Sequence, residues 1–483
     1  MSPILSRRSL LTRTAAASLA FAALARSSAL GSPAARPLPA LVPDPAGLLD
    51  LPDGFSYRVI SRTGDRMADG LFTPGAPDGM ATFAVPGDLR HCLVVRNHEL
   101  NPRVTDRGAF GPDHALAKAV PAGAIYDFAL DGRPLLGGTS TFLYDLREGR
   151  IVEDHLSLVG TSKNCCGGPT PWESWLSCEE ALEAPGDGGS KWHGFVFEVP
   201  ATDRGLAEPV PLTAMGRFMH EAVAVDPDSG ALYLTQDEGR CLFYRFLPDS
   251  RGELRKGGRL QALAVHGHRG ADLRNWPVDA EPGWGAGTVR PGAEMLVEWI
   301  DLDHVESPDA DLHSRGAAAG AALFSRGEGL AVGRDVHGRP EIFFTCTDGG
   351  AAQIGQVWRY RPSRFEGRPG ESQEPGRLTL VYESSDTALL ESCDNLVVSP
   401  WGDLFICEDR PVSGRDVRNH LVVLPPGGVP FPFARNMDAA NGEFAGACFS
   451  PDGSTLFVNI QRPGLTLAVT GAWERLHRLG QDA

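Results

Sequence analysis

The chain has 483 residues, of which 42% are hydrophobic, and its formal net charge is -16. This length and apolar content suit one large or two ordinary globular domains with a sizeable core. Nucleic acid is an unsuitable partner, because binding a phosphate backbone needs a cationic surface. The negative charge would also repel an anionic substrate unless bound cations reverse the local field.

The first 30 residues have the pattern of a twin-arginine export signal. Arg7 and Arg8 precede an Ala/Leu-rich run over residues 15–25, and small residues follow around Ser27. The apolar run is shorter than the roughly 20 residues that a membrane-spanning helix needs, and no later stretch qualifies. We therefore expect recognition by the twin-arginine translocation machinery, a periplasmic or extracellular location, and no stable membrane span.

The residue pattern of the chain changes at Leu51. Residues 31–50 are rich in Pro and Ala, and we expect a disordered or extended leader there. From Leu51 onward, short apolar runs alternate with Gly, Pro, Asp and Asn, which is typical of closely spaced β-strands. Residues 251–320 indicate a loop-rich excursion. Helices are indicated only over residues 317–323 and 472–479, the second within a C-terminal tail over residues 471–483.

Four segments repeat a pattern of polar start, short strand, Gly-containing turn and second strand. They begin at His220, Gly327, Asp394 and Glu443. Repeated units of three or four antiparallel strands are typical of a β-propeller. The sequence therefore predicts an all-β fold, with residues 51–470 as a single propeller domain with inserted loops and few short helices. Five to seven blades fit the length, and we predict six.

The repeats place carboxylates at equivalent positions. Glu221, Glu328 and Asp394 each stand just before the first strand of a unit. In a propeller the first strand is innermost, so these side chains should lie around the axis at one end. Several like charges repel strongly at low effective dielectric, and their coexistence suggests bound cations. The ends of the second strands carry a further acidic set, Glu238, Asp348, Glu408 and Asp409.

A stretch over residues 160–180 combines two kinds of metal ligand. Asn164, Cys165 and Cys166 precede a Gly-Gly-Pro turn, and the next strand ends in Glu179 and Glu180. A thiolate suits iron or zinc, whereas carboxylate and amide oxygens suit calcium or magnesium. The stretch therefore indicates a site for more than one metal. The alternative is a tight turn with a buried cysteine pair and a solvated acidic end.

Nine short motifs, taken in order, resemble those of the PhoX-type alkaline phosphatases, a likeness that runs from about Leu51 to Gly464. They are RNHE at 96–99, NCCGG at 164–168, TPW at 170–172, CEE at 178–180, GRFMHE at 216–221, RGE at 326–328, DN at 394–395, CED at 407–409 and FSPDG at 449–453. The resemblance implies a six-bladed propeller that carries iron and calcium at one end of its axis and removes phosphate from monoesters outside the cytoplasm.

The resemblance also implies the metal ligands, by motif position. Cys165 corresponds to the iron-binding thiolate, and Glu179 or Glu180 to a neighbouring metal carboxylate. Glu221 and Glu328 fall where further metal ligands belong. Two more expected ligands are Asp394 and Glu408. Clustered metals would suit phosphoryl transfer, because they neutralise phosphate and lower the pKa of bound water.

Three residues are expected to serve the substrate side of the same site. Arg326 corresponds to an arginine that meets the substrate phosphate, which a guanidinium can grip with two hydrogen bonds. Asn97 and Glu99 match a motif at the site whose division between metal and phosphate stays open. We predict that these three residues take part in catalysis.

Two features depart from the family pattern, and two other functions stay open. The chain is shorter than better-characterised members, and Cys166 stands where a small residue is more familiar, which leaves substrate range and metal stoichiometry open. One alternative is a calcium-dependent propeller lactonase or esterase, which would have no use for Cys165. The other is a non-enzymatic calcium-binding propeller, for which Arg326 would be dispensable.

Overall fold

The computed structural model describes residues 39–202, 204–277, 289–411 and 417–481. Within these ranges the chain is all-β with few helices, as predicted. The described helices are α3 (Leu312–Ala318), α4 (Trp473–Gln481) and four short 3-10 turns, Ala115–Ala119, Ala122–Ala124, Thr213–Met215 and Leu254–Lys256. None of the helices described is long and apolar enough to cross a membrane. The export signal predicted over residues 1–30 lies outside the described ranges.

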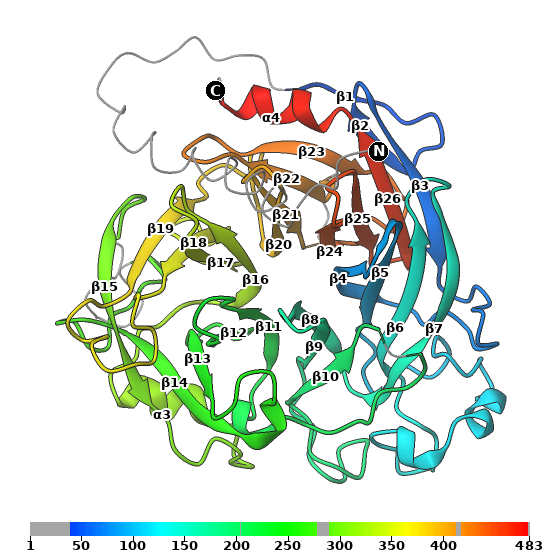
Figure 1. The fold of residues 1–483 in the computed structure, drawn as a ribbon, viewed down its shortest axis with the longest axis horizontal. Coiled ribbons are helices and arrows are strands. Elements are labelled where there is room, and N and C mark those ends of the chain that lie inside the picture. The colour runs from blue at the N-terminus through cyan, green and yellow to red at the C-terminus, as the bar shows by residue number, and fades with distance from the viewer. Residues whose placement is uncertain (1–38, 203, 278–288, 412–416, 482–483) are drawn as a thin grey trace, which may run out of the picture.

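The strands form five antiparallel sheets, which Figure 1 shows around a central axis. The first contains β4 (Pro77–Val85), β5 (Asp88–His98), β6 (Gly137–Asp145) and β7 (Arg150–Thr161). The second contains β8 (Asn164–Pro169), β9 (Ser174–Glu179) and β10 (Val196–Pro200). The third contains β11 (His220–Val225), β12 (Leu232–Gln236), β13 (Tyr244–Pro248), β14 (Gly258–Val265), β15 (Glu294–Asp301), β16 (Gly327–Arg334), β17 (Pro340–Cys346), β18 (Gln356–Arg361) and β19 (Arg377–Glu383).

The two remaining sheets combine strands from both ends of the chain. In one, β20 (Cys393–Val398), β21 (Leu404–Glu408), β22 (His420–Leu424) and β23 (Phe431–Asn436) are followed by β2 (Leu49–Pro52) and β1 (Leu41–Val42). In the other, β24 (Phe444–Phe449), β25 (Thr455–Ile460) and β26 (Leu465–Gly471) are followed by β3 (Phe55–Arg62). Pairing of β3 with β26 joins the two ends of the propeller-like ring.

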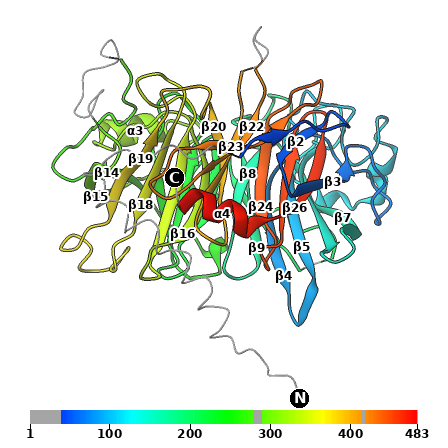
Figure 2. The same cartoon turned by 90° about the horizontal axis from the view of Figure 1, so that it is seen from above.

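The innermost strands form a closed ring. They are β4, β8, β11, β16, β20 and β24, and each contacts the next, including β24 with β4. The sheets radiate from this ring like the blades of a propeller (Figure 1), and Figure 2 shows the same arrangement from the side, with inner strands such as β4, β8 and β24 running roughly along the axis. The nine-stranded sheet supplies both β11 and β16, because β15 pairs with β14 on one side and with β19 on the other. Six blades were predicted, and the structure has six inner strands in five continuous sheets.

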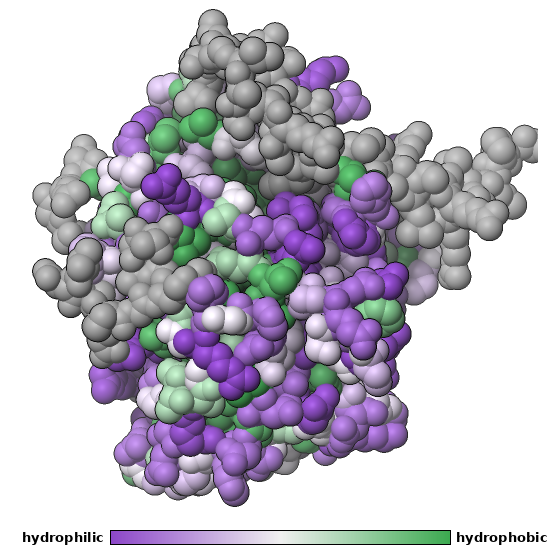
Figure 3. Space-filling model, turned by 90° about the vertical axis from the view of Figure 1, so that its left-hand side faces the viewer, coloured by the Kyte–Doolittle hydropathy of each residue, from purple (hydrophilic) through white to green (hydrophobic). Residues whose placement is uncertain are grey.

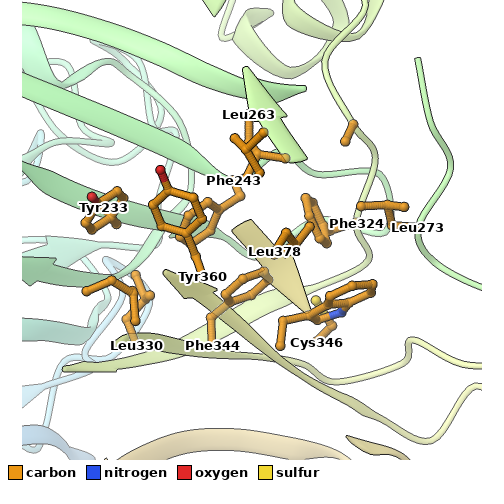
Figure 4. Close-up of a cluster of buried hydrophobic side chains, with 14 of the residues drawn as sticks. Tyr233, Phe243, Leu263, Leu273, Phe324, Leu330, Phe344, Cys346, Tyr360 and Leu378 are labelled. Carbon is orange, nitrogen blue, oxygen red and sulfur yellow. The ribbon is translucent and has the colours of Figure 1, made fainter. Parts of the chain in front are cut away.

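The two halves of the nine-stranded sheet share an aromatic core, which Figure 4 shows. Phe243 stacks on Phe344 with ring centroids 4.4 Å apart, and Tyr233 meets Tyr360 edge to face at 5.4 Å. All four side chains are buried. Fully burying one such side chain stabilises a fold by about 1.5–3 kcal/mol. These contacts join β12 to β18 and the residue before β13 to β17, so the core fixes the two halves of the sheet relative to each other.

The N-terminal boundary predicted for the fold is wrong by several residues. The leader was expected over residues 31–50, yet β1 and β2 begin at Leu41 and Leu49 and continue the sheet that ends in β23. Leu49 is buried, and the Asp50 carboxylate accepts hydrogen bonds from Arg435 at 2.6 and 3.0 Å. The apolar side chains were present in the sequence, but their partner strand is nearly 400 residues away.

The C-terminal tail is folded. Helix α4 matches the helix expected at residues 472–479, and through Trp473 and Leu476 it packs against side chains of both the β23 sheet and the β24 sheet. Trp473 meets Phe433 and Phe449 with ring centroids 5.5 and 5.3 Å away. The tail therefore covers apolar surface that the outer strands would otherwise expose.

The excursion expected over residues 251–320 is more regular than predicted, because it contains β14, β15 and α3. Helix α3 also begins five residues before the helix expected at residues 317–323 and ends near Gly320, whose φ of 98° is left-handed. The sequence of β15 does not alternate between apolar and polar residues, because Met295, Leu296 and Val297 form an apolar run in which Leu296 is 38% exposed. The surface on the side of β15 is mostly hydrophilic, with small scattered apolar groups (Figure 3).

Candidate metal centre

Every inner strand has the same β-bulge near its start. In β11, for example, Glu221 and Ala222 together lie opposite Thr235, between the register pairs His220–Gln236 and Val223–Leu234. A bulge of this kind bends the strand and re-aims a side chain. The first bulge residues of the six inner strands are, in order, Asp78, Cys165, Glu221, Glu328, Asp394 and Gly446. Five of these six positions carry a metal-binding side chain.

The five bulge side chains and two others form three linked groups of possible ligands. These groups are Asp78 with Glu99 and Cys165, Cys165 with Glu180 and Glu221, and Glu221 with Glu328 and Asp394. Within each group the ligand atoms all lie within 4.8 Å of one another. Because Cys165 and Glu221 each belong to two groups, the three groups make one continuous centre, which we call the acidic centre.

Burial makes the acidic centre costly without cations. Asp78, Cys165, Glu221, Glu328 and Asp394 have pKa values raised well above their usual ranges, first by burial and then by repulsion from neighbouring acids. The same causes raise the pKa of Glu99, and they raise that of Glu180 to about 8.

One buried carboxylate oxygen of the acidic centre, Glu221 Oε2, has no hydrogen-bond partner among the described residues. Cys165 Sγ donates to the other oxygen, Glu221 Oε1, at 3.1 Å. A buried carboxylate oxygen is normally satisfied. Thiolate and carboxylate donors are also the set that suits a soft metal beside a hard one. The residues present therefore fit bound metal ions.

Cys166 lies outside the acidic centre. It is the second bulge residue of β8, and at four of the five equivalent positions stand Gly79, Ala222, Gly329 and Ala447. The space is tight, since a Cβ on Gly79 would lie 2.7 Å from Cys166 Cα. The Cys166 side chain packs in the apolar cluster that contains Ala222. Its place in the fold is that of a small space-filling residue.

Asn97 holds the thiol strand rather than facing the centre. Its Nδ2 donates to the carbonyl oxygens of Cys165 at 3.1 Å and Cys166 at 2.7 Å. Its Oδ1 accepts from Trp175 Nε1 and Ser177 Oγ, both at 2.8 Å. These bonds use both ends of the amide, so the geometry gives Asn97 a positioning role. The motif suggests that Asn97 takes part in catalysis. In this structure, however, both ends of its side-chain amide are already hydrogen-bonded within the protein.

The same kind of bond recurs around the ring. Asn459 Nδ2 donates to Asp78 O at 2.6 Å, and Thr345 Oγ1 donates to Asp394 O at 2.6 Å. Thr235 Oγ1 donates to Glu328 O. Each of these donors lies on the second strand of one sheet unit and binds the bulge of the next inner strand. The ring of bonds fixes the bulges, and therefore the ligands, relative to one another.

Glu179 and Glu408, two expected metal ligands, lie outside the acidic centre. Glu179 accepts hydrogen bonds from Ser162 N at 2.9 Å, His193 Nδ1 at 2.7 Å and Gly194 N at 2.9 Å. Successive residues at a strand end face opposite ways, so Glu179 and Glu180 do not share one direction, and it is Glu180 that reaches the centre.

Glu408 is likewise fully engaged. Its oxygens accept from Arg410 Nε at 2.6 Å, Glu391 N at 2.8 Å and His420 N at 2.9 Å. It ends β21, on the second strand of its sheet, where the side chain pairs with a neighbouring loop instead of the axis. Glu179 and Glu408 thus stand outside the three ligand groups, and the ligand roles predicted for them find no support in this geometry.

Asp78 is a member of the centre that the sequence prediction missed. It is fully buried, and its Oδ2 accepts from Gln461 Nε2 at 2.8 Å. The signal was present, because Asp78-Gly79 at the start of β4 repeats the Glu328-Gly329 pair at the start of β16. This short pair alone was not enough to align the start of β4 with the later repeats.

Arg326 stands at the edge of the centre. Its Nε and Nη2 donate to the two oxygens of Asp237 at 2.8 and 3.0 Å, and Nη2 also donates to Glu328 Oε1 at 3.0 Å. Burial lowers the pKa of Arg326, but the Asp237 and Glu328 carboxylates outweigh it and raise that pKa. The side chain is 36% exposed, whereas that of Glu328 is 5% exposed. A permanent cation therefore joins the buried ligands to the solvent.

Comparisons with known proteins bear on the fold and the family of the chain. The PhoX of Pseudomonas fluorescens in complex with vanadate, a transition state analogue, matches with a TM-score of 0.63 and 19% identity, over 88% of this chain and 96% of that one. At this identity the match shows a shared fold.

Two other solved structures match the chain with much lower TM-scores. A pyranose dehydrogenase PQQ domain from Coprinopsis cinerea, at 8% identity over 89% of this chain and 98% of that one, has a TM-score of 0.32. A Trichoderma reesei enzyme of carbohydrate-active family AA12, at 10% identity over 88% and 98%, has a TM-score of 0.28. Both scores are too low to support an argument. No curated protein matches the chain. The family model "Alkaline phosphatase PhoX" matches residues 37–121 and 144–464, and the chain therefore belongs to the PhoX alkaline phosphatase family.

Proposed function

We propose that the protein is an exported metal-dependent phosphomonoesterase that hydrolyses phosphate monoesters at a centre of iron and calcium. Family membership supports a phosphatase. The observation that carries the metal part is the chain of three linked ligand groups, in which a buried thiol meets buried carboxylates and Glu221 Oε2 has no partner among the described residues.

The ligand types divide the acidic centre between two kinds of metal. Iron would be held at Cys165, the one thiol of the three groups, together with its neighbours Glu180 and Glu221. Calcium would be held by the all-oxygen group of Glu221, Glu328 and Asp394 and beside Asp78. Bound there, the metals would neutralise phosphate and lower the pKa of a water molecule.

Arg326 would bind the substrate phosphate. Its described contacts use Nε and Nη2, so a phosphate oxygen would bind at Nη1. Asp237 holds the guanidinium plane in place from the opposite side through two hydrogen bonds. A cation fixed in this way orients the phosphate toward the buried ligands and requires no rearrangement when the transition state forms.

The finer architecture follows from the bulges. Six inner strands with one shared bulge support six propeller units, with the nine-stranded sheet as two units joined through β15. We propose one catalytic domain in which the strands from β1 to β26 act together. The sequence of residues 1–30 supports export by the twin-arginine route to the periplasm or beyond.

The test compares the two neighbouring cysteines. We expect Cys165→Ala to lower kcat/KM for p-nitrophenyl phosphate at least about 100-fold, as for loss of a metal ligand, and to lose iron by elemental analysis. Cys166→Ala is the matched control and should keep iron and most activity, because its side chain packs in an apolar cluster.

Three results would argue against the proposal. Full phosphatase activity in Cys165→Ala would exclude the thiolate–iron site. Purified protein that contains calcium alone and hydrolyses a lactone or carboxylic ester would favour the calcium-dependent hydrolase instead. Protein that binds calcium and hydrolyses neither substrate would favour a non-enzymatic propeller.

A further inference from the structure

Lys163 and Arg326 occupy equivalent positions in the ring. Each stands two residues before a bulge ligand, Lys163 before Cys165 and Arg326 before Glu328. Both have left-handed backbones, with φ of 48° and 45°. Such φ values are disfavoured for residues other than glycine and persist where the surrounding structure imposes them. The repeat thus projects both side chains from the same corner of two inner strands.

The local backbone explains why Lys163 is held there. Its N–H donates to Leu100 O at 3.1 Å, and its carbonyl accepts from Glu180 N at 3.0 Å. The Lys163 backbone is therefore bonded to Leu100, which follows Glu99, and to Glu180, and Glu99 and Glu180 are both members of the acidic centre. Neither bond depends on the side chain.

The Lys163 ammonium contacts the acidic centre as Arg326 does. Nζ lies 2.6 Å from Glu180 Oε1 and 3.5 Å from Glu99 Oε1. The Lys163 side chain is 31% exposed, whereas those of Glu180 and Glu99 are 6% and 17% exposed. Like Arg326, it therefore touches buried ligands on one side and solvent on the other.

Among the described residues, Lys163 and Arg326 are the two cations that form ion pairs with members of the three ligand groups. They precede β8 and β16, the two strands that flank β11 in the ring. The equivalent left-handed positions before β4 and β20 carry Ala76 and Ser392, which have no charge. The repeats thus place a cation on each side of the strand that carries Glu221.

We propose that Lys163 is a second phosphate-binding residue, the counterpart of Arg326 on the other side of β11. This inference rests on the proposed function. An ammonium has three N–H donors, of which two face Glu180 and Glu99, and the third would donate to a phosphate oxygen. Two cations on separate strands would fix the phosphate against rotation as well as attract it.

The test uses Lys163→Met and Lys163→Arg in metal-loaded full-length protein, with Lys256→Met as a control for an exposed lysine that pairs with Glu253. Inorganic phosphate is titrated by calorimetry, and KM, kcat and metal content are measured in parallel. We expect Lys163→Met to raise the phosphate Kd and the KM at least about tenfold, the loss of one charge-assisted hydrogen bond. Metal content should stay unchanged, and Lys163→Arg should recover part of the affinity.

Two results would overturn the role of Lys163. One is an unchanged phosphate Kd in Lys163→Met, and the other is loss of bound metal from that variant, which would make the ammonium a balancing charge only. The outcome is separable from the proposed function. Wild-type protein that binds phosphate through Lys163 but hydrolyses no monoester would refute the phosphatase and keep the phosphate site. Wild-type protein that binds no phosphate would refute both.

Discussion

At the residue scale, neighbouring side chains at one strand end serve opposite purposes. Glu179 is fully buried among donors and pairs with His193, which also lies 3.2 Å from Asp127. Burial lowers the pKa of His193, but the two carboxylates outweigh it and raise that pKa to about 10. Glu180 instead faces the acidic centre, where burial and like charges raise its pKa. Glu179 therefore stabilises the fold, whereas the charge of Glu180 destabilises it.

This contrast predicts opposite effects for two conservative substitutions. Glu179→Gln should destabilise the protein by about 3 kcal/mol, because it breaks a buried ion pair and leaves His193 with one carboxylate. Glu180→Gln should leave the unfolding temperature of the metal-free protein equal or higher, because it removes a repelled charge, while phosphatase activity falls at least about tenfold. Thermal unfolding and p-nitrophenyl phosphate assays check both. Equal loss of stability in the two variants would contradict the assignment.

The sequence allowed much of the site to be predicted at this scale. Glu221, Glu328 and Asp394 were found because their repeats share a visible polar start. The choice between Glu179 and Glu180 could not be made, because it depends on which face of β9 meets the axis. Asp78 and Lys163 were missed for a related reason. Their equivalence to the other residues follows from bulge register, of which the sequence shows only a trace in the Asp78-Gly79 pair.

At the element scale, one carboxylate organises the turn between the short strands β1 and β2. Asp44 accepts hydrogen bonds from Ala46 N at 3.0 Å, Leu48 N at 2.8 Å and the Tyr57 hydroxyl at 2.6 Å. Burial raises the pKa of Asp44, but these donors outweigh it and lower that pKa to about 2. The Asp44 charge therefore fastens the first turn of the sheet to β3.

The lowered pKa gives a pH-dependent prediction. A carboxylate with a depressed folded-state pKa stabilises the fold above its unfolded pKa of about 3.8, and this contribution is lost as pH falls through about 2. Asp44→Asn should therefore lower stability at pH 7 by roughly 1–3 kcal/mol. The difference from wild type should shrink between pH 4 and pH 2 in denaturant titrations. A difference that stays constant over this range would show that Asp44 acts through its shape and not its charge.

Elements also show where repeat patterns stop being informative. The alternation of short strands predicted the sheet units, but not the pairing of β15 with β19 that fuses two of them. That pairing involves three residue pairs at the outer edge and leaves no periodic signature. Likewise, Leu49–Pro52 could not be recognised as a strand from local sequence, since its hydrogen-bond partner lies in β23.

At the scale of the whole molecule, the acidic centre lies where all the inner strands converge. Each ligand comes from a different part of the chain, from Asp78 to Asp394, so repulsion at the centre acts on the entire ring. Cations that bind only the folded state stabilise it in proportion to the logarithm of their concentration. Under the proposed function, bound metals would therefore serve stability and chemistry together.

Removal of calcium should reveal this coupling. We expect excess chelator to lower the unfolding temperature of the purified protein by at least several degrees, roughly 2–4 °C for each kcal/mol lost in a larger domain, and to abolish phosphatase activity. Re-addition of calcium should restore both, as measured by calorimetry and by p-nitrophenyl phosphate hydrolysis. An unfolding temperature insensitive to chelator would mean that protonation of the acidic side chains, and not bound metal, removes their mutual repulsion.

The pairing of β3 with β26 has a consequence for biosynthesis. Residues 55–62 meet residues 465–471 as neighbours in one sheet, so the strand that leaves the ribosome among the earliest must wait for a partner that leaves among the last. Until then its edge is unsatisfied, and a polypeptide terminated before β26 would leave both β3 and β25 without the strand that pairs with them. Ring closure is thus a post-translational event, and truncated products should associate with one another instead of remaining monomeric.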